Sequence, residues 1–206
     1  GQHGFARDLE HRLVSQTANE LTFELTSGEE TYAYFPYDFA LRSTYTLEGR
    51  RISHSVAVRN TGKGTLRFGF GYHPGFALPF DDAHTAEDYD VVFDTVESPL
   101  CLNTAPNGLV CASPDYYLAR NVDRIPLSAK LFAHDSHCMV NLKSKTMSVV
   151  ERDTGRRIVV DIADFPYTLI WSTPQVPMRF IFIEACHSIP SGENGPIEWE
   201  EKPWAA

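Results

Sequence analysis

Apolar and polar residues alternate in short runs along most of this chain. Such period-two alternation is typical of half-buried β-strands, and these runs are rich in the Val, Ile, Thr and aromatic residues that favour strands. The runs predicted as strands are 21–26, 52–58, 65–72, 89–93, 147–150, 157–162, 167–171 and 180–183.

Glycine-containing clusters separate these runs and predict tight turns at 47–50, 60–64 and 153–156, because glycine supplies the positive φ that such turns require. Thirteen prolines disfavour long helices. Only residues 119–132 have room for a short helix, which Pro126 interrupts. Many short strands with frequent turns predict an all-β fold, a large antiparallel β-sandwich.

Composition places the chain among ordinary globular proteins, since 43% of its 206 residues are hydrophobic and 22% are charged. No repeat, low-complexity tract or linker divides it, so residues 1–206 are expected to form a single domain. The net charge is −9, and no basic run interrupts the acidity. We therefore expect no nucleic acid partner. We also expect no membrane partner, because no apolar stretch is long enough to span a bilayer.

The four cysteines, Cys101, Cys111, Cys138 and Cys186, contain no Cys-x-x-Cys pair. They are too sparse for a disulfide scaffold. Free thiols and a cytoplasmic location are the expectation that follows.

Two places where polar residues gather among glycines and aromatics centre on histidines. His3 and Arg7 lie four residues apart, where they either bind a polar ligand or belong to a disordered terminus. His73 follows the run at 65–72 and stands among several glycines, which allow close approach to the backbone. A sugar ring, with its apolar face and hydroxyl rim, suits such a setting. The alternative is a histidine at a bend whose hydrogen bonds are made to neighbouring residues.

Two further places centre on carboxylates. His134 and His137 flank Asp135, but two histidines at this spacing without a third ligand motif seldom bind zinc. A hydrogen-bonding loop carboxylate at Asp135 is therefore favoured over a metal site. Glu184 follows the apolar run 180–183, and burial there would raise its pKa toward the range of a proton-transfer group. The alternative is a carboxylate in water or in an ion pair.

Taken in order, the motifs of the chain resemble the aldose 1-epimerase (galactose mutarotase-like) family over nearly its whole length. They are His-Gly-Phe-Ala-Arg at 3–7, Phe-Pro-Tyr-Asp-Phe at 35–39, Val-Arg-Asn-Thr-Gly at 58–62, Gly-Tyr-His-Pro-Gly-Phe at 71–76, Phe-Pro-Tyr at 165–167, Ile-Trp-Ser at 170–172 and Phe-Ile-Glu at 182–184. The first motif is similar to a bacterial branch near the hexose-6-phosphate mutarotases. The resemblance implies a supersandwich truncated at both ends, whose unpaired edge strands would favour a homodimer.

The resemblance also implies a role for each candidate residue. His73 would be the general acid toward the ring oxygen, and Glu184 the general base at the anomeric hydroxyl. The implied substrate-binding residues are His3, Arg7 and Asp135. The implied reaction interconverts the α and β anomers of a hexose by opening and closing the ring. It involves no redox change, so it implies no cofactor and no metal, and a small-molecule sugar as the partner.

Two other functions stay open. Ala185 and Cys186 stand where the family often has Pro-Trp, and Trp is a common stacking platform for sugars, so a non-catalytic carbohydrate-binding sandwich is one alternative. A hexose-6-phosphate mutarotase is the other. It would need cationic groups around the mouth of the pocket, for which Arg7, Arg42 and Arg67 are candidates.

Overall fold

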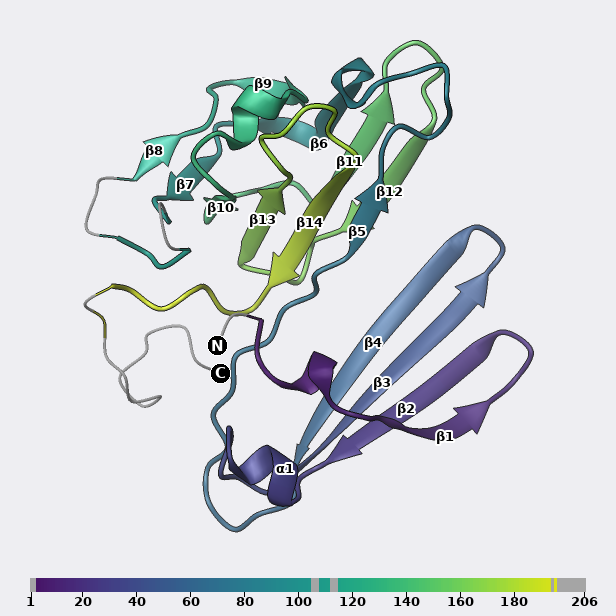
Figure 1. The fold of residues 1–206 in the computed structure, drawn as a ribbon, viewed down its shortest axis with the longest axis vertical. Coiled ribbons are helices and arrows are strands. Elements are labelled where there is room, and N and C mark those ends of the chain that lie inside the picture. Colours follow the sequence, from purple (N-terminus) through teal and green to yellow (C-terminus); the bar gives the residue numbers. More distant parts are fainter. Residues whose placement is uncertain (1–2, 105–107, 112–114, 194, 196–206) are drawn as a thin grey trace. The chain divides into compact units, whose positions relative to one another are not determined.

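The computed structural model describes residues 3–104, 108–111, 115–193 and 195. Contacts between residues divide the chain into two compact units, Gly1–Leu66 and Arg67–Ala206. Each unit is built of antiparallel β-sheet (Figure 1), as the alternating pattern predicts. That the whole chain forms one domain stays a prediction.

The first unit is a four-stranded meander in the order β1-β2-β3-β4. Its strands β3 and β4 pair without interruption from Phe39↔Asn60 to Glu48↔Arg51. Gly49 lies in the turn between them at φ 59°, which is the positive φ that the turn motif predicts. The elements of this unit are η1 (Ala6–Asp8), β1 (Arg12–Gln16), β2 (Glu20–Thr26), α1 (Glu29–Tyr32), β3 (Phe39–Glu48) and β4 (Arg51–Asn60).

The second unit contains two sheets, ordered β5-β14-β13-β10-β7-β8 and β12-β11-β6-β9. Cross-strand pairing within them is antiparallel throughout. The elements are β5 (Gly75–Ala77), η2 (Ala86–Asp88), β6 (Tyr89–Glu97), β7 (Leu100–Leu102), β8 (Tyr116–Tyr117), β9 (Val122–Pro126), η3 (Ala129–Phe132), β10 (His137–Met139), β11 (Thr146–Glu151), β12 (Arg157–Asp161), β13 (Tyr167–Trp171) and β14 (Phe180–Cys186).

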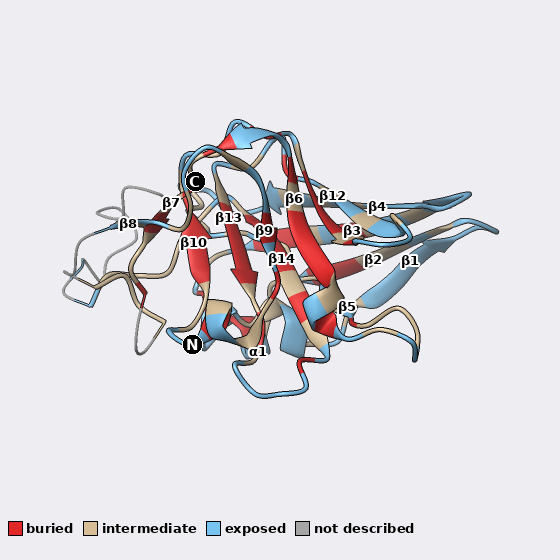
Figure 2. Ribbon diagram, turned by 90° about the horizontal axis from the view of Figure 1, so that it is seen from above, coloured by how far each residue is buried: buried red, intermediate tan, exposed pale blue. Residues whose placement is uncertain are grey.

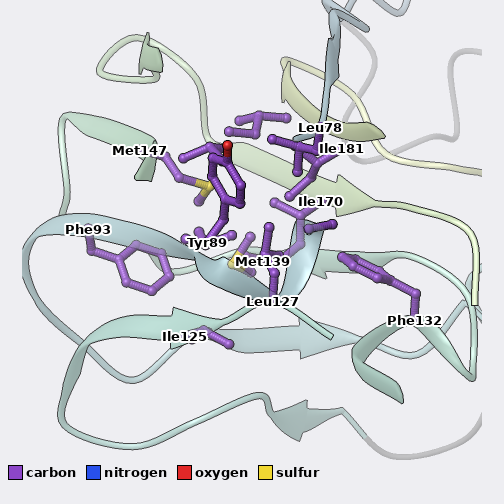
Figure 3. Close-up of a cluster of buried hydrophobic side chains, with 14 of the residues drawn as sticks. Leu78, Tyr89, Phe93, Ile125, Leu127, Phe132, Met139, Met147, Ile170 and Ile181 are labelled. Atoms are coloured by element: carbon purple, nitrogen blue, oxygen red, sulfur yellow. The ribbon is translucent and has the colours of Figure 1, made fainter. Parts of the chain in front are cut away.

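The hydrophobic core of the second unit lies between its two sheets (Figures 2 and 3). From one sheet, Tyr89 of β6 and Met147 of β11 are fully buried; from the other, Met139 of β10, Ile170 of β13 and Ile181 of β14 meet them. Burying a large apolar side chain contributes roughly 1.5–3 kcal/mol, so this layer holds the two sheets together as a sandwich. Alternate residues of the six-stranded sheet therefore face away from the core.

The structure confirms the predicted strands at 21–26, 52–58 and 89–93, which lie within β2, β4 and β6. The later predicted strands also match β11, β12, β13 and β14. Turns containing Gly49 and Gly155 adopt the expected positive φ, whereas Gly62 and Gly64 at 60–64 do not. The four cysteines are free thiols. Across the described ranges, no helix is long and apolar enough to cross a membrane.

Two predicted elements, the strand at 65–72 and the helix at 119–132, are wrong. Residues 65–72 form no strand of their own, and only Gly71 makes a bridge, to Cys186. Its glycines weaken a strand because they offer no side chain to pack, so His73 does not end a strand. Residues 119–132 are not a helix but strand β9 followed by the short η3. There Ile125 pairs with Val91 and joins the core, and this tertiary packing decides the local structure.

Candidate active site

Two glycines bring the segment that carries His73 onto strand β14. Gly71 bridges Cys186, and Gly75 pairs with Phe182, both antiparallel. His73 lies midway between these two glycines, and Glu184 lies midway between their two partners. The antiparallel register therefore places His73 opposite Glu184. A Cβ on Gly71 would lie 2.4 Å from the Cys186 sulfur, and one on Gly75 would lie 2.7 Å from the Phe182 ring. These glycines therefore accommodate neighbouring side chains of the protein itself, a role that differs from the expected close approach of a sugar.

His73 and Glu184 are in direct contact. The Nε2 atom of His73 lies 3.2 Å from Oε1 of Glu184, and the imidazole packs edge-on against the Phe182 ring at 4.5 Å between centroids. The His73 side chain is 30% exposed and that of Glu184 11%. Burial, with a smaller contribution from the negative charge of Asp135, raises the pKa of Glu184 to about 7. The carboxyl group therefore exchanges a proton near neutral pH.

Glu184 lies within β14 rather than at its end. It pairs with Leu169 of β13, which in turn pairs with Cys138 of β10. These residues form one row across the face of the sheet that points away from the core. Trp171 and Phe182 are cross-strand partners on this face, with ring centroids 5.7 Å apart. The face thus combines an acid–base pair with an adjoining aromatic surface.

Asp135 lies in the turn between η3 and β10, close enough for its charge to raise the pKa of Glu184. Its backbone has φ 88°, a left-handed conformation that Asp tolerates better than most residues but that remains strained. Within the described residues its carboxylate makes no hydrogen bond or ion pair. Asp135 therefore has free acceptor capacity beside the pair.

His3 and Arg7 belong to the first unit. Phe5 lies between them and packs against Phe35 and Phe39, with centroids 5.7 and 6.1 Å away. This aromatic anchoring favours an ordered segment over a disordered terminus. Arg7 lies 3.5 Å from the carboxylate of Asp8, and both side chains are mostly exposed.

The pair of histidines flanking Asp135 is not arranged as a metal site. Both ring nitrogens of His137 are engaged, Nδ1 by the Tyr116 hydroxyl at 2.7 Å and Nε2 by the Leu131 carbonyl at 2.6 Å. His137 is buried, whereas His134 is exposed. His137 therefore has no lone pair available for a metal ion.

A cluster that the sequence did not indicate lies outside this site, where Asp81, His84 and Glu151 come within metal-ligand spacing. His84 bonds to Asp81 at 2.6 Å and to Asp153 at 3.1 Å. These hydrogen bonds raise the pKa of His84 to about 9, so at neutral pH both of its nitrogens carry protons. Arg156 bonds to Asp81 and Glu151. Protonated His84 thus has no lone pair for a metal, and Arg156 neutralises the two carboxylates, so the cluster is an ionic network.

Sequence reasoning did not identify Phe182, Cys186 or Cys138 as neighbours of the pair. The sequence did contain a signal for Phe182 and Cys186. Residues 182, 184 and 186 lie on the same face of any strand that continues to residue 186. The burial that raises the pKa of Cys186 to about 12, with a contribution from the charge of Glu184, could not be read from the chain. The position of Cys138 depends on which strands are neighbours, which no local pattern gives.

The all-β architecture agrees with the comparison with known proteins. The family model for aldose 1-epimerase matches residues 1–192. The chain belongs to the aldose 1-epimerase family.

Among individual relatives, the plasmid-encoded protein LacX of Lactococcus lactis subsp. lactis is 32% identical over 205 residues, which cover 98% of this chain and 68% of LacX. The crystal structure of a galactose mutarotase related enzyme from Lactobacillus acidophilus superposes with a TM-score of 0.92 at 26% identity, covering all of this chain and 68% of that one. A galactose mutarotase-like protein from Lactobacillus casei gives a TM-score of 0.87 at 26% identity, with 70% of its chain covered. The antiparallel β-sandwich fold is therefore shared with mutarotase-like proteins.

Proposed function

We propose that this protein interconverts the α and β anomers of an aldose. Glu184, as carboxylate, takes the proton of the hydroxyl on C1, while protonated His73 gives a proton to the ring oxygen. The bond between C1 and the ring oxygen breaks, and an aldehyde forms. After rotation about the C1–C2 bond, the ring oxygen attacks the other face of the aldehyde. Glu184 then returns its proton to the carbonyl oxygen, and the ring hydroxyl returns its proton to His73.

The observation that carries this proposal is the contact between His73 and Glu184. Both oxygens that exchange protons are bonded to C1, so an acid and a base lying side by side can serve one each. The ideal pKa of such a group lies near the working pH, and the pKa of Glu184 is about 7. Each assisted proton transfer contributes typically 10²–10⁴-fold.

The aromatic surface next to the pair supports a sugar as the ligand. Trp171 and Phe182 are only partly buried, and they can cover the apolar face of a pyranose. Asp135 has free acceptor capacity for a hydroxyl. We assign it, with His3 and Arg7, to substrate binding on the resemblance of their motifs to those of the family.

Two of the three cations considered for a phosphorylated sugar lie next to carboxylates of the protein itself. Arg42 lies 2.7 Å from the Glu24 carboxylate, and Arg7 lies near Asp8, so two of the three candidate cations already have anionic neighbours. A neutral hexose is the substrate class we favour.

The test is magnetisation exchange between the anomeric protons of glucose and of galactose, measured by NMR with and without the protein. We expect exchange above the spontaneous rate, unaffected by a chelator, and faster for neutral sugars than for their 6-phosphates. The matched controls are Glu184→Gln, which preserves the size of the side chain and removes proton transfer, and His73→Asn, which removes the ring that transfers the proton. Because the two groups act together, the double variant should be little slower than either single variant.

Two results would contradict the proposal. One is sugar binding by line broadening with no exchange above background, which identifies a carbohydrate-binding protein. The other is a Glu184→Gln variant with normal turnover, which excludes the assigned base.

A further inference from the structure

We propose that His137 is a positioning residue that holds the turn carrying Asp135, through a hydrogen bond from its ring to the carbonyl of Leu131. The inference rests on the proposed function insofar as that function gives Asp135 a role in sugar binding. It assigns to His137 no contact with the sugar.

A chain of hydrogen bonds runs from the sheet into this turn. Cys101 and Tyr116 are cross-strand partners of β7 and β8. The Tyr116 hydroxyl lies 2.7 Å from Nδ1 of His137, and Nε2 of His137 lies 2.6 Å from the Leu131 carbonyl oxygen. The ring of His137 is therefore held between Tyr116 and Leu131 by one hydrogen bond at each nitrogen.

The partners determine where the proton of the imidazole resides. A carbonyl oxygen only accepts, so Nε2 must carry the hydrogen and donate it to Leu131. Burial lowers the pKa of His137, which keeps the ring neutral, so Nδ1 is an acceptor for the Tyr116 hydroxyl. Besides the Tyr116 hydroxyl, Asp135 and His134 are the titratable groups that affect the ring, and their influences on its pKa oppose each other.

The hydrogen bond to Leu131 closes the turn in which Asp135 lies. His137 is the first residue of β10, and Leu131 is in η3, so the ring spans the intervening residues. Inside this loop Asp135 has φ 88°, and its backbone N–H donates to the Phe132 carbonyl at 3.2 Å. A strained conformation persists only when the surrounding structure holds it. His137, 6% exposed, is a rigid strand residue able to do so.

The consequence concerns where the Asp135 carboxylate lies relative to Glu184. Without the link to Leu131, the turn can relax toward a conformation with negative φ, and the carboxylate moves with it. Two properties should change together: the affinity for sugar, and the electrostatic effect of Asp135 on Glu184.

A matched pair of variants separates this role from simple loss of packing. In His137→Gln the amide reaches about as far as Nε2 and retains a donor for Leu131. In His137→Asn the amide reaches only as far as Nδ1, so it retains a partner for Tyr116 and loses Leu131. Each variant keeps one of the two hydrogen bonds, and both should lose similar stability in urea unfolding.

We expect KM for the sugar to rise about tenfold in His137→Asn with kcat within about twofold of wild type, and KM in His137→Gln to stay within about threefold. The midpoint of the Glu184 titration, followed by carboxyl ¹³C NMR, should fall in His137→Asn and stay in place in His137→Gln. Equal KM values and equal Glu184 midpoints in the two variants would overturn the proposal.

Two readouts keep the inference testable apart from activity. If the wild-type chain shows no anomeric exchange, the proposed function fails, and the Glu184 midpoints still decide the role of His137. If His137→Asn does not fold, the tautomer of His137 in the wild-type protein decides instead. ¹⁵N NMR should show a neutral ring with its proton on Nε2, and a proton on Nδ1 at pH 7 refutes the proposal.

Discussion

Replacing Glu184 by Gln should make the protein more stable at neutral pH while abolishing its proposed activity. Glu184 is 8% exposed, and burial raises the pKa of its carboxyl group. An ionised carboxylate in this position is therefore unfavourable for folding. The amide of Gln has nearly the same size and carries no charge, but it cannot accept a proton as a base.

The magnitude follows from the pKa difference between the folded and unfolded chain. The pKa rises from 4.5 to about 7 on folding, which is about 2.5 units, and at about 1.4 kcal/mol per unit this is roughly 3 kcal/mol. Between pH 4.5 and 7 the folded protein binds more protons than the unfolded chain, so the free energy of unfolding falls as the pH rises. Below pH 4.5 the carboxyl group is protonated in both states, and the effect is absent.

The assay is urea unfolding of wild type and Glu184→Gln from pH 4 to pH 8. The stability of the variant relative to wild type should increase with pH by roughly 3 kcal/mol in total and level off above about pH 7. In the same preparation, the rate of anomeric exchange should fall at least ~10²-fold. A variant that gains stability and loses rate is characteristic of a residue kept for function.

Glu24 provides a control of opposite sign. Hydrogen bonds from Arg42 and Arg12 lower the pKa of this similarly buried carboxyl group, outweighing its burial. Its contribution to stability is present above pH 4.5 and is lost as the pH falls, so Glu24→Gln should be less stable than wild type at neutral pH. If His73 controlled the charge of Glu184, Glu184→Gln would follow the Glu24 pattern. That result, or a difference independent of pH, would refute the reasoning.

Three further predictions follow from single contacts. Asp135→Asn removes a negative charge that raises the pKa of the proposed base, so the acidic limb of kcat/KM should move to lower pH, and KM should rise; an unmoved limb contradicts this. Gly75→Ala places a Cβ 2.7 Å from the Phe182 ring and should lower stability by about 1–3 kcal/mol in urea unfolding, whereas Gly64→Ala, which meets no atom within 4 Å, should change it little. Tyr89→Phe removes a hydroxyl that donates to the buried Glu151 carboxylate at the end of β11. The free energy of unfolding should fall by about 1–3 kcal/mol. A fall of less than about 0.5 kcal/mol would show that the carboxylate finds another donor.

The alternation of apolar and polar residues was sufficient to predict the all-β class and most long strands. This prediction succeeded because each strand of a two-layer sandwich buries one face. The alternation of buried and exposed residues can therefore be read from each short segment of sequence by itself. It failed at 65–72, where alternation with glycine looks like a strand although Gly71 instead lets the Cys186 side chain approach. It also failed at 119–132, where the sheet neighbours of Ile125 decide the local structure.

The candidate site was predictable only in part. That Glu184 would be buried with a raised pKa followed from the apolar residues before it, and the structure confirms it. The resemblance of motifs pointed to His73, and the register of Gly71 and Gly75 against β14 explains why it reaches Glu184. The hydrogen bonds of His137 were not predictable, because they join residues of three elements that approach only through the sheet order.

Two buried glutamates show how the proposed catalytic carboxylate differs from a structural one in this protein. For Glu151 burial alone would raise the pKa, but hydrogen bonds from Thr154, Tyr89 and Arg156 outweigh it and lower the pKa. Its charge is therefore fully compensated, as expected of a group that strengthens the fold. For Glu184 burial and Asp135 both raise the pKa, and the described residues place no arginine or lysine against it. A buried acid with a raised pKa is what we expect of the proposed base, and the contact with His73 is where we propose that its proton is exchanged.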